Sequence, residues 1–252
     1  MIRVENAVKR YEETVVVDGV SLELATGGVT AIIGPNGAGK STLLSMISRL
    51  IGLDAGTVSI DGLDVTKTQS DVLARRLSIL RQDNQMTARL TVGDLVAFGR
   101  YPHSRGRLTR EDARHIENSL GYMDMGGFRD RFLDELSGGQ RQRAFVAMVL
   151  CQDTDYVLFD EPLNNLDIRH AVSMMHMIRR AADDLGKTVI VVLHDINFAS
   201  CHADRIVAMR DGKIFRQGTP EEIIRSDVLE ELYGTAFEVT VTTGKRIANY
   251  YT

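Results

Sequence analysis

A glycine-rich segment near the N-terminus has the residue types and spacing that bind phosphate. Residues 34–42 read GPNGAGKST and match G-x-x-x-x-G-K-[ST] in full, between an apolar run and an amphipathic run. Glycines let successive backbone N–H groups curl around a phosphate, and the lysine brings positive charge to the β and γ oxygens. The predicted loop consists of Gly34, Pro35, Asn36, Gly37, Ala38, Gly39, Lys40, Ser41 and Thr42. The Ser41 hydroxyl is placed to ligate Mg²⁺.

Two acidic residues and a histidine end later apolar runs. Asp160 and Glu161 end YVLFDE, and His194 ends TVIVVLH. If these runs are parallel strands, their carboxyl ends meet at the sheet edge that also holds the phosphate loop. There Asp160 can hold Mg²⁺, Glu161 can polarise an attacking water, and His194 can reach the γ-phosphate. The alternative is that the acids are merely solvated and the histidine is structural.

A second pattern for anion binding lies at residues 135–144, which read ELSGGQRQRA. Ser137 is a helix N-cap candidate, and Gly138, Gly139 and Gln140 open a helical run that carries two arginines. A helix N-terminus binds anions through unpaired N–H groups and the positive end of its dipole. Ser137, Gly138 and Gly139 thus offer donors that have no internal ligand, and the chain carries two candidate phosphate sites.

The segments that must position these residues alternate between strand and helix patterns. Strand-like runs dominate residues 2–33, and Asp61-Gly62 and Asp211-Gly212 predict hairpin turns. Residues 156–160 and 188–193 are continuous apolar runs, which are typical of parallel strands buried on both faces. Residues 41–52 predict a helix with Leu43, Leu44, Ile47, Leu50 and Ile51 on one face. Residues 168–185 predict a helix that ends at Gly186 and uses its methionines, at 174, 175 and 177, for packing.

The middle of the chain changes character. Strand patterns vanish over 89–152, and capping-box patterns at Thr91 and Thr109 predict helix starts. The predicted fold is therefore one α/β domain, 1–252, with a parallel sheet, an N-terminal antiparallel β subdomain and an inserted α-helical subdomain. We place the core at 1–88 and 153–235, the helical subdomain at 89–152 and a tail at 236–252. The tail is either a final strand or a disordered end.

Composition excludes several classes. The formal net charge of −4 and the lack of a basic stripe argue against nucleic-acid binding. Two distant cysteines, Cys151 and Cys201, make a disulfide framework unexpected and favour a reducing compartment. The first residues lack the apolar core of a signal peptide, and the longest apolar runs are too short to cross a membrane. We expect no direct membrane insertion.

Together these motifs resemble the ATP-binding cassette family, the nucleotide-binding subunits of ABC transporters. LSGGQ, residues 136–140, is identical to the family signature, and the phosphate loop, the acidic pair and His194 follow the family's order. Three further positions match: Tyr11 looks like the residue that stacks on adenine, Gln82 like the Q-loop glutamine, and Asp167 like the end of the D-loop NNLD. Arg81 departs from the family pattern, which often has proline before the glutamine.

The resemblance implies a RecA-like P-loop NTPase core and an enzyme that hydrolyses ATP to drive transport. Two copies are expected to dimerise head to tail, so that the signature of one closes over the γ-phosphate held by the other. This accounts for the second anion site. The implied catalytic residues are Lys40, Gln82, Glu161 and His194, and the implied Mg²⁺ ligands are Ser41, Gln82 and Asp160. The implied nucleotide-binding residues are Tyr11, Asp167, the phosphate loop, Ser137, Gly138, Gly139 and Gln140.

The resemblance also implies partners and a location. An integral-membrane permease would hold the chain at the cytoplasmic face of the membrane, and a siderophore-binding protein would act indirectly. GRYPHSRGRLTRED and PLNNLDIRH look like importer cassettes for iron(III)–siderophore complexes, with catecholate types favoured. Haem, cobalamin or another substrate is the alternative.

Soluble ABC ATPases of DNA repair or translation are rival classes. Repair proteins with long arms split the cassette with a coiled coil, but no heptad run occurs in this sequence. Translation factors carry two cassettes in one chain, whereas 252 residues hold one. A protein that only senses nucleotide is a third rival class. The presence of Glu161 and His194 counts against it, because these residues favour ATP turnover. Neighbouring genes for a permease and a solute-binding protein would favour the importer.

Overall fold

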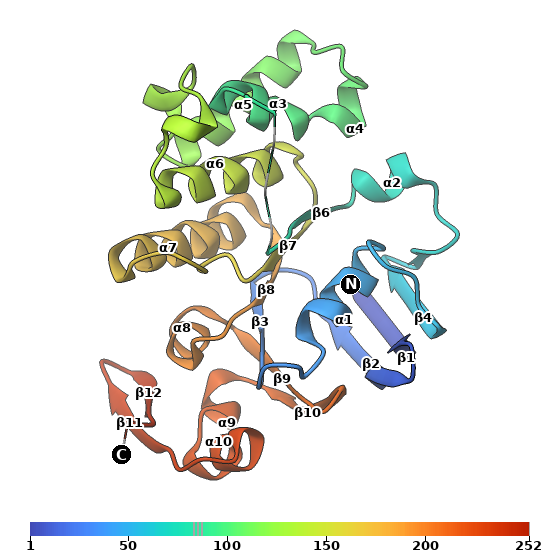
Figure 1. Cartoon of the computed structure of the whole chain (residues 1–252), viewed down its shortest axis with the longest axis vertical. Helices are drawn as coiled ribbons and strands as arrows, with labels where there is room; N and C mark the ends of the chain where they lie inside the picture. Colours follow the sequence, from blue (N-terminus) through green and yellow to red (C-terminus); the bar gives the residue numbers. More distant parts are fainter. Residues whose placement is uncertain (83, 85, 87, 252) are drawn as a thin grey trace.

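A six-stranded sheet forms the centre of the computed structural model, which describes residues 1–82, 84, 86 and 88–251 (Figure 1). Neighbouring strands are parallel except for the antiparallel pair at one edge. In spatial order the strands are β10 (Lys213–Gly218), β9 (Arg205–Arg210), β3 (Val29–Ile33), β8 (Thr188–Val192), β7 (Tyr156–Asp160) and β6 (Leu77–Leu80). This confirms the predicted α/β class with a parallel sheet.

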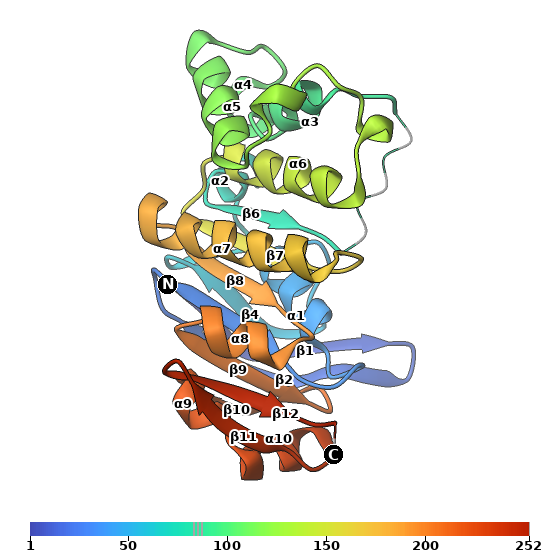
Figure 2. The same ribbon diagram turned by 90° about the vertical axis from the view of Figure 1, so that its left-hand side faces the viewer.

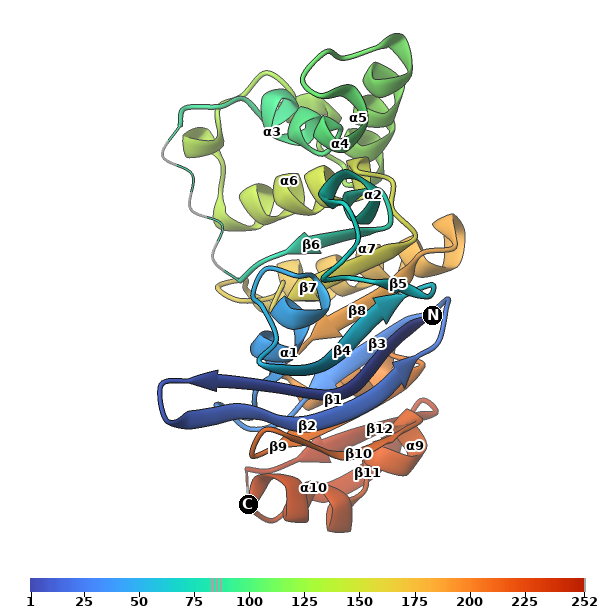
Figure 3. The same cartoon turned by 90° about the vertical axis from the view of Figure 1, so that its right-hand side faces the viewer.

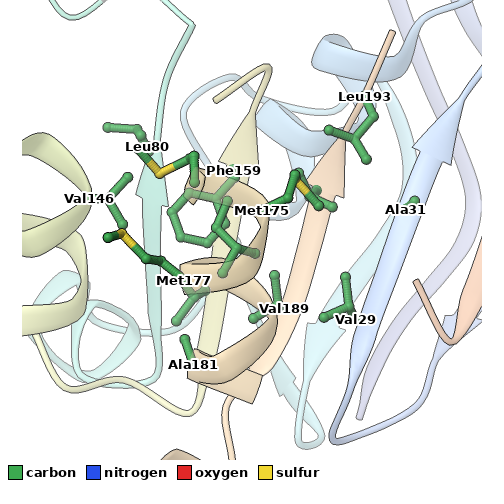
Figure 4. Packing of buried hydrophobic residues seen from close by; sticks show 14 of the residues in the cluster. Val29, Ala31, Leu80, Val146, Phe159, Met175, Met177, Ala181, Val189 and Leu193 are labelled. Atoms are coloured by element: carbon green, nitrogen blue, oxygen red, sulfur yellow. The ribbon is translucent and has the colours of Figure 1, made fainter. Parts of the chain in front are cut away.

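Apolar residues alternate between the two faces of this sheet, so each face has its own core. Val157 and Phe159 of β7 join the cluster under α6 and α7, whereas Leu158 joins the cluster on the opposite face. Figure 4 shows Phe159 among side chains from α6, β6 and α7, and Met175 is fully buried there. The methionines of α7 therefore serve packing, as predicted.

The second face is covered by α1 (Lys40–Ile47) and an antiparallel sheet (Figure 3). The strands of that sheet, in spatial order, are β2 (Thr14–Leu24), β1 (Ile2–Tyr11), β4 (Ala55–Ile60) and β5 (Leu63–Asp64). The hairpins at Asp61-Gly62 and Asp211-Gly212 are confirmed by the pairing of the strands on either side. The antiparallel β part of the predicted fold is thus present.

Helix α1 is shorter than its apolar pattern predicts. It ends at Ile47, and Arg49 adopts a positive φ of 57°. The Arg49 guanidinium donates to the backbone carbonyls of Val65 and Thr68, which holds the chain in this turn. As a result Leu50, expected on the buried face, is 46% exposed.

Helices gather beyond β6 at one end of the molecule (Figures 1 and 2). Thr91 and Thr109 form the capping boxes that the sequence predicts, so both helix starts are confirmed. The helices in this part of the chain are α2 (Ser70–Ala74), α3 (Val92–Phe98), α4 (Tyr101–Ser104), α5 (Arg110–Tyr122) and α6 (Gly138–Cys151), with 3-10 turns at Gly126–Phe128 and Leu133–Glu135. The exact limits 89–152 of the helical subdomain stay a prediction.

The C-terminal part returns to the sheet. Gly186 ends α7 in a left-handed conformation, as predicted. The remaining helices are α7 (Ile168–Leu185), α8 (Ile196–His202), α9 (Pro220–Ile223) and α10 (Ser226–Tyr233). The tail, which the sequence left open, forms the hairpin β11 (Glu238–Thr242) and β12 (Lys245–Asn249), and β12 packs on α8 (Figure 2). No helix in the described ranges has the length and apolarity needed to cross a membrane.

Candidate functional site

The phosphate loop connects β3 to α1. Gly34 has a φ of +145°, and a Cβ there would collide with the backbone carbonyl of Met209. Gly39 is the N-cap of α1 with a φ of +92°, a left-handed conformation that favours glycine. Lys40 Nζ donates to the carbonyls of Gly34 at 2.8 Å and Pro35 at 2.9 Å, so the ammonium lies within the loop. Burial lowers the pKa of Lys40, while Glu161 and Asp160 act in the opposite direction.

Ser41 and Asp160 are in direct contact at the end of β7. The Ser41 hydroxyl donates to Asp160 Oδ1 at 2.7 Å. Burial raises the pKa of Asp160, and the negative charge of Glu161 adds to this, whereas the bond from Ser41 and the charge of Lys40 oppose it. A cation at this position would relieve the carboxylate's electrostatic cost.

The donor set fits Mg²⁺. A hydroxyl and a carboxylate are the hard oxygen ligands that Mg²⁺ prefers, and it commonly takes only one or two protein ligands beside substrate phosphates. Among the described residues no group of three or more His, Cys, Asp or Glu side chains converges on one point. Phosphate oxygens, waters and the expected ligand Gln82 would complete the shell around Ser41 and Asp160.

Glu161 is surrounded by polar side chains from its own turn and from two other segments. It is 8% exposed and has a φ of +52°, which is uncommon for a residue with a side chain. Its Oε1 lies 2.6 Å from His194 Nε2. Its Oε2 accepts from Gln82 Nε2 at 2.6 Å and from the Asn164 amide. The structure thus brings Gln82, Glu161 and His194 together, and it adds Asn164.

The family resemblance placed Asn164 at the start of the D-loop NNLD, but the sequence analysis gave it no role at the site. The chain turns sharply after Glu161, with Asn165 also at positive φ (61°), and this turn folds the Asn164 side chain back onto Glu161. The sequence signals are its place in the D-loop NNLD and its position three residues after a strand-end glutamate. The same turn lines a cleft of about 270 Å³ that Glu161, Asn164 and His194 share with apolar Leu163, Leu166 and Phe198.

The second candidate anion site, at residues 137–140, does lie at the start of a helix. Ser137 is the N-cap of α6, and its hydroxyl accepts from the backbone N–H of Gln140. One expectation was wrong, because the Ser137 backbone N–H donates to Gln140 Oε1 at 3.0 Å and so has an internal partner. Gly138 and Gly139 are the first residues of α6, where backbone N–H groups have no acceptor within the helix.

The two candidate anion sites of one chain, which both lie in the described ranges, are not in contact with each other. Among the described residues, no hydrogen bond joins 137–140 to residues 34–42, and Figure 3 shows β6 and β7 between α6 and α1. Asp167 is the N-cap of α7 and bonds to His170. Tyr11 lies at the end of β1 and is 49% exposed, so its contact with adenine stays a prediction.

The parallel sheet, the loop between β3 and α1, and the acidic pair at the end of β7 define a P-loop NTPase. Comparison with known proteins identifies the family. The family model described as ABC transporter matches residues 17–164. The chain belongs to the ABC transporter family, as an ATP-binding cassette.

Relatives match over nearly their whole length. The petrobactin import ATP-binding protein YclP of Bacillus subtilis (strain 168) is 50% identical over 251 residues, covering 100% of both chains. The ferric enterobactin transport ATP-binding protein FepC of Escherichia coli (strain K12) is 40% identical over 235 residues, covering 92% of this chain and 87% of FepC.

A solved structure agrees with the fold. The ATP-binding cassette MJ0796, described as dimeric, in a post-hydrolysis state and bound to ADP and Pi, superposes with a TM-score of 0.77 at 28% identity. The match covers 87% of this chain and 99% of MJ0796.

Proposed function

We propose that the chain is the ATP-hydrolysing subunit of an importer for iron(III)–siderophore complexes. The observation that carries the proposal is the arrangement around Glu161. One strand-end carboxylate contacts His194, Gln82 and Asn164, and it lies next in the chain to Asp160, which is bonded to Ser41 of the phosphate loop. This is the arrangement that ATP hydrolysis needs, because a water activator lies beside a phosphate-binding loop.

Each residue of the site has a proposed role in hydrolysis. Lys40 stabilises the charge that builds on the transferring phosphoryl group, and His194 contacts the γ-phosphate. Glu161 orients the attacking water and takes its proton, while Gln82 and Asn164 hold the carboxylate in position. When bound by Ser41, Asp160 and Gln82, Mg²⁺ supplies positive charge beside the β and γ oxygens.

The site is completed by a second copy of the chain. Ser137, Gly138 and Gly139 present the start of α6 on a surface of their own, away from the phosphate loop of the same chain. In a head-to-tail dimer this surface meets the partner's γ-phosphate, and two-fold symmetry makes both sites equivalent. The dimeric description of the related cassette MJ0796 supports this arrangement.

The proposed partners follow from the family. An integral-membrane permease holds the dimer at the cytoplasmic face of the membrane, and a siderophore-binding protein delivers the cargo to that permease. The full-length match to a petrobactin importer subunit and the match to a ferric enterobactin subunit support siderophore cargo. Catecholate siderophores remain the favoured type.

Uptake of radioactive iron tests the proposal. Cells that lack the protein should lose uptake from ferric petrobactin or ferric enterobactin, and the wild-type gene should restore it. Glu161→Gln should not restore uptake, although the variant protein accumulates to the same level. Normal uptake of both chelates in the deletion strain, with loss of haem or cobalamin uptake instead, would overturn the siderophore assignment.

A further inference from the structure

Near their N-terminal ends, helices α6 and α7 are in contact through the side chain of His170. His170, in the first turn of α7, lies directly against Gly139, the second residue of α6. Figure 2 shows the two helices stacked with these ends on the same side of the molecule. Nothing in the roles described above requires a histidine at this position.

Asp167 holds the His170 ring. The His170 backbone N–H donates to Asp167 Oδ1 at 2.8 Å, and the ring Nδ1 lies 2.7 Å from the same oxygen. A carboxylate only accepts hydrogen bonds, so this contact assigns the proton to Nδ1. The ring orientation is therefore tied to the residue that ends the D-loop.

Gly139 leaves no room for a side chain. A Cβ there would lie 2.6 Å from Cδ2, 2.9 Å from Cγ and 3.2 Å from Nε2 of His170. At neighbouring Gly138, a Cβ would meet nothing within 4 Å among the described residues. Gly139 has an ordinary helical backbone, so φ does not require glycine at this position. Glycine is required because the His170 ring occupies the space that a Cβ atom would take.

The His170 ring also borders a cleft. A cleft of about 220 Å³ is lined by Gly139, Arg143, Arg169, His170 and Ser173. Arg143 Nε is buried and has no hydrogen-bond partner within the described part of the chain. Because the ring borders this cleft, we take the contact with Asp167 as the interaction that orients it toward Gly139.

We propose that His170 is a positioning residue, which fixes the start of α6 relative to the D-loop. The inference rests on the proposed function, in which both segments face the second copy and its nucleotide. With the ring in place, Ser137, Gly138 and Asp167 move as one unit when the dimer closes. Without it, the signature reaches the partner's γ-phosphate with a less defined geometry, and small misplacements of this kind reduce rates strongly.

A suppressor experiment with the full-length protein tests this fit. Gly139→Ala should lower kcat/KM for ATP by about tenfold, because the new methyl group displaces the ring or the helix. His170→Ala should lower it by about threefold through loss of positioning. The double variant should return to the level of His170→Ala, because the methyl group occupies the space of the ring. Adding His170→Ala should not rescue Gly138→Ala, because a side chain at position 138 has no contact with His170.

A second measurement covers the case in which Gly139→Ala does not fold. In a Glu161→Gln background, His170→Ala should raise the ATP concentration for half-maximal dimer formation by about fivefold. His170→Asn, whose amide can still donate to Asp167 but lacks the ring, should behave like His170→Ala. An unchanged ATP dependence, or a double variant as poor as Gly139→Ala alone, overturns the proposal. Failure of the wild type to hydrolyse ATP, or of Glu161→Gln to dimerise, would instead count against the proposed function.

Discussion

At the scale of single residues, both carboxylate oxygens of Glu161 have partners. Oε1 contacts His194, and Oε2 accepts from Gln82 and Asn164. Three contacts, one from the same turn and two from other segments, fix the direction of the carboxylate more tightly than any one of them. The site therefore depends on orientation as well as on charge.

Replacing Glu161 separates binding from turnover. Glu161→Gln keeps the shape of the side chain but cannot take a proton from water, so ATP turnover should fall at least about 100-fold. ATP should still bind and drive dimer formation, which sedimentation with and without ATP would measure. A variant that hydrolyses ATP at the normal rate would contradict the role given to Glu161.

Asn164 is expected to act through Glu161. Asn164→Ala removes one donor to Oε2, so kcat should fall by about three- to tenfold while KM for ATP changes little. Asn164→Asp has the same size but places a second negative charge beside Glu161, and it should lose more. Steady-state ATPase assays of both variants provide the comparison. If Asn164→Asp matches the wild type, the contact has no functional role.

At the scale of elements, a buried ion pair holds the helices around α6 together. Arg100 Nε donates to Asp112 Oδ1 at 2.8 Å and Arg100 also donates to the Cys151 carbonyl, with both charged side chains 5% exposed. Burial alone would raise the pKa of Asp112, but bonds from Thr109 and Arg100 outweigh it and lower the pKa to about 2. The pair links the start of α5 to the end of α6.

The pair should give a pH-dependent contribution to stability. Asp112→Asn leaves the Arg100 charge buried without an opposite charge, so the free energy of unfolding at pH 7 should drop by about 3 kcal/mol. Because the folded pKa is lowered, the wild-type advantage is complete above pH about 4 and is lost as the pH falls toward 2. Urea unfolding from pH 7 to pH 3 measures both. The exposed pair of Arg105 and Asp71 is the control, and Asp71→Asn should cost less than about 1 kcal/mol. Equal losses for the two variants would refute the buried role.

The C-terminal hairpin docks on the helix that follows His194. Asn197 of α8 donates to the Ala248 carbonyl at 3.2 Å and accepts from the Ala248 N–H at 2.8 Å. Asn197→Ala should lower the local stability of the hairpin by about 1–3 kcal/mol. Hydrogen exchange should then become faster over 238–249, whereas Thr242→Ala, an exposed change in the same hairpin, should have little effect. Unchanged exchange in Asn197→Ala would show that other contacts hold the hairpin.

At the scale of the whole molecule, the features that could be predicted from the sequence are those set by residues close together in the chain. The phosphate loop, the caps at Thr91 and Thr109 and the parallel sheet all follow from short patterns. The contacts of Asn164 and His170 do not, because they depend on a turn with positive φ and on how two helices pack. The early end of α1 was missed for a similar reason, since carbonyls from residues 65–68 bind Arg49.

The partition of the site between two chains is the central claim. Lys40→Ala disables the phosphate loop, and Ser137→Arg blocks the start of α6, so neither variant alone should hydrolyse ATP. In a head-to-tail mixed dimer, both defects fall in one site and the other site is intact. A composite site is therefore the only arrangement in which mixing the two inactive chains restores turnover.

ATPase activity of an equal mixture of purified Lys40→Ala and Ser137→Arg is the most direct test. The mixture should regain about a quarter of wild-type turnover, since half of randomly formed dimers are mixed and each has one intact site. Activity no higher than the sum of the separate variants, with mixed dimers shown to form, would contradict a site shared between two copies.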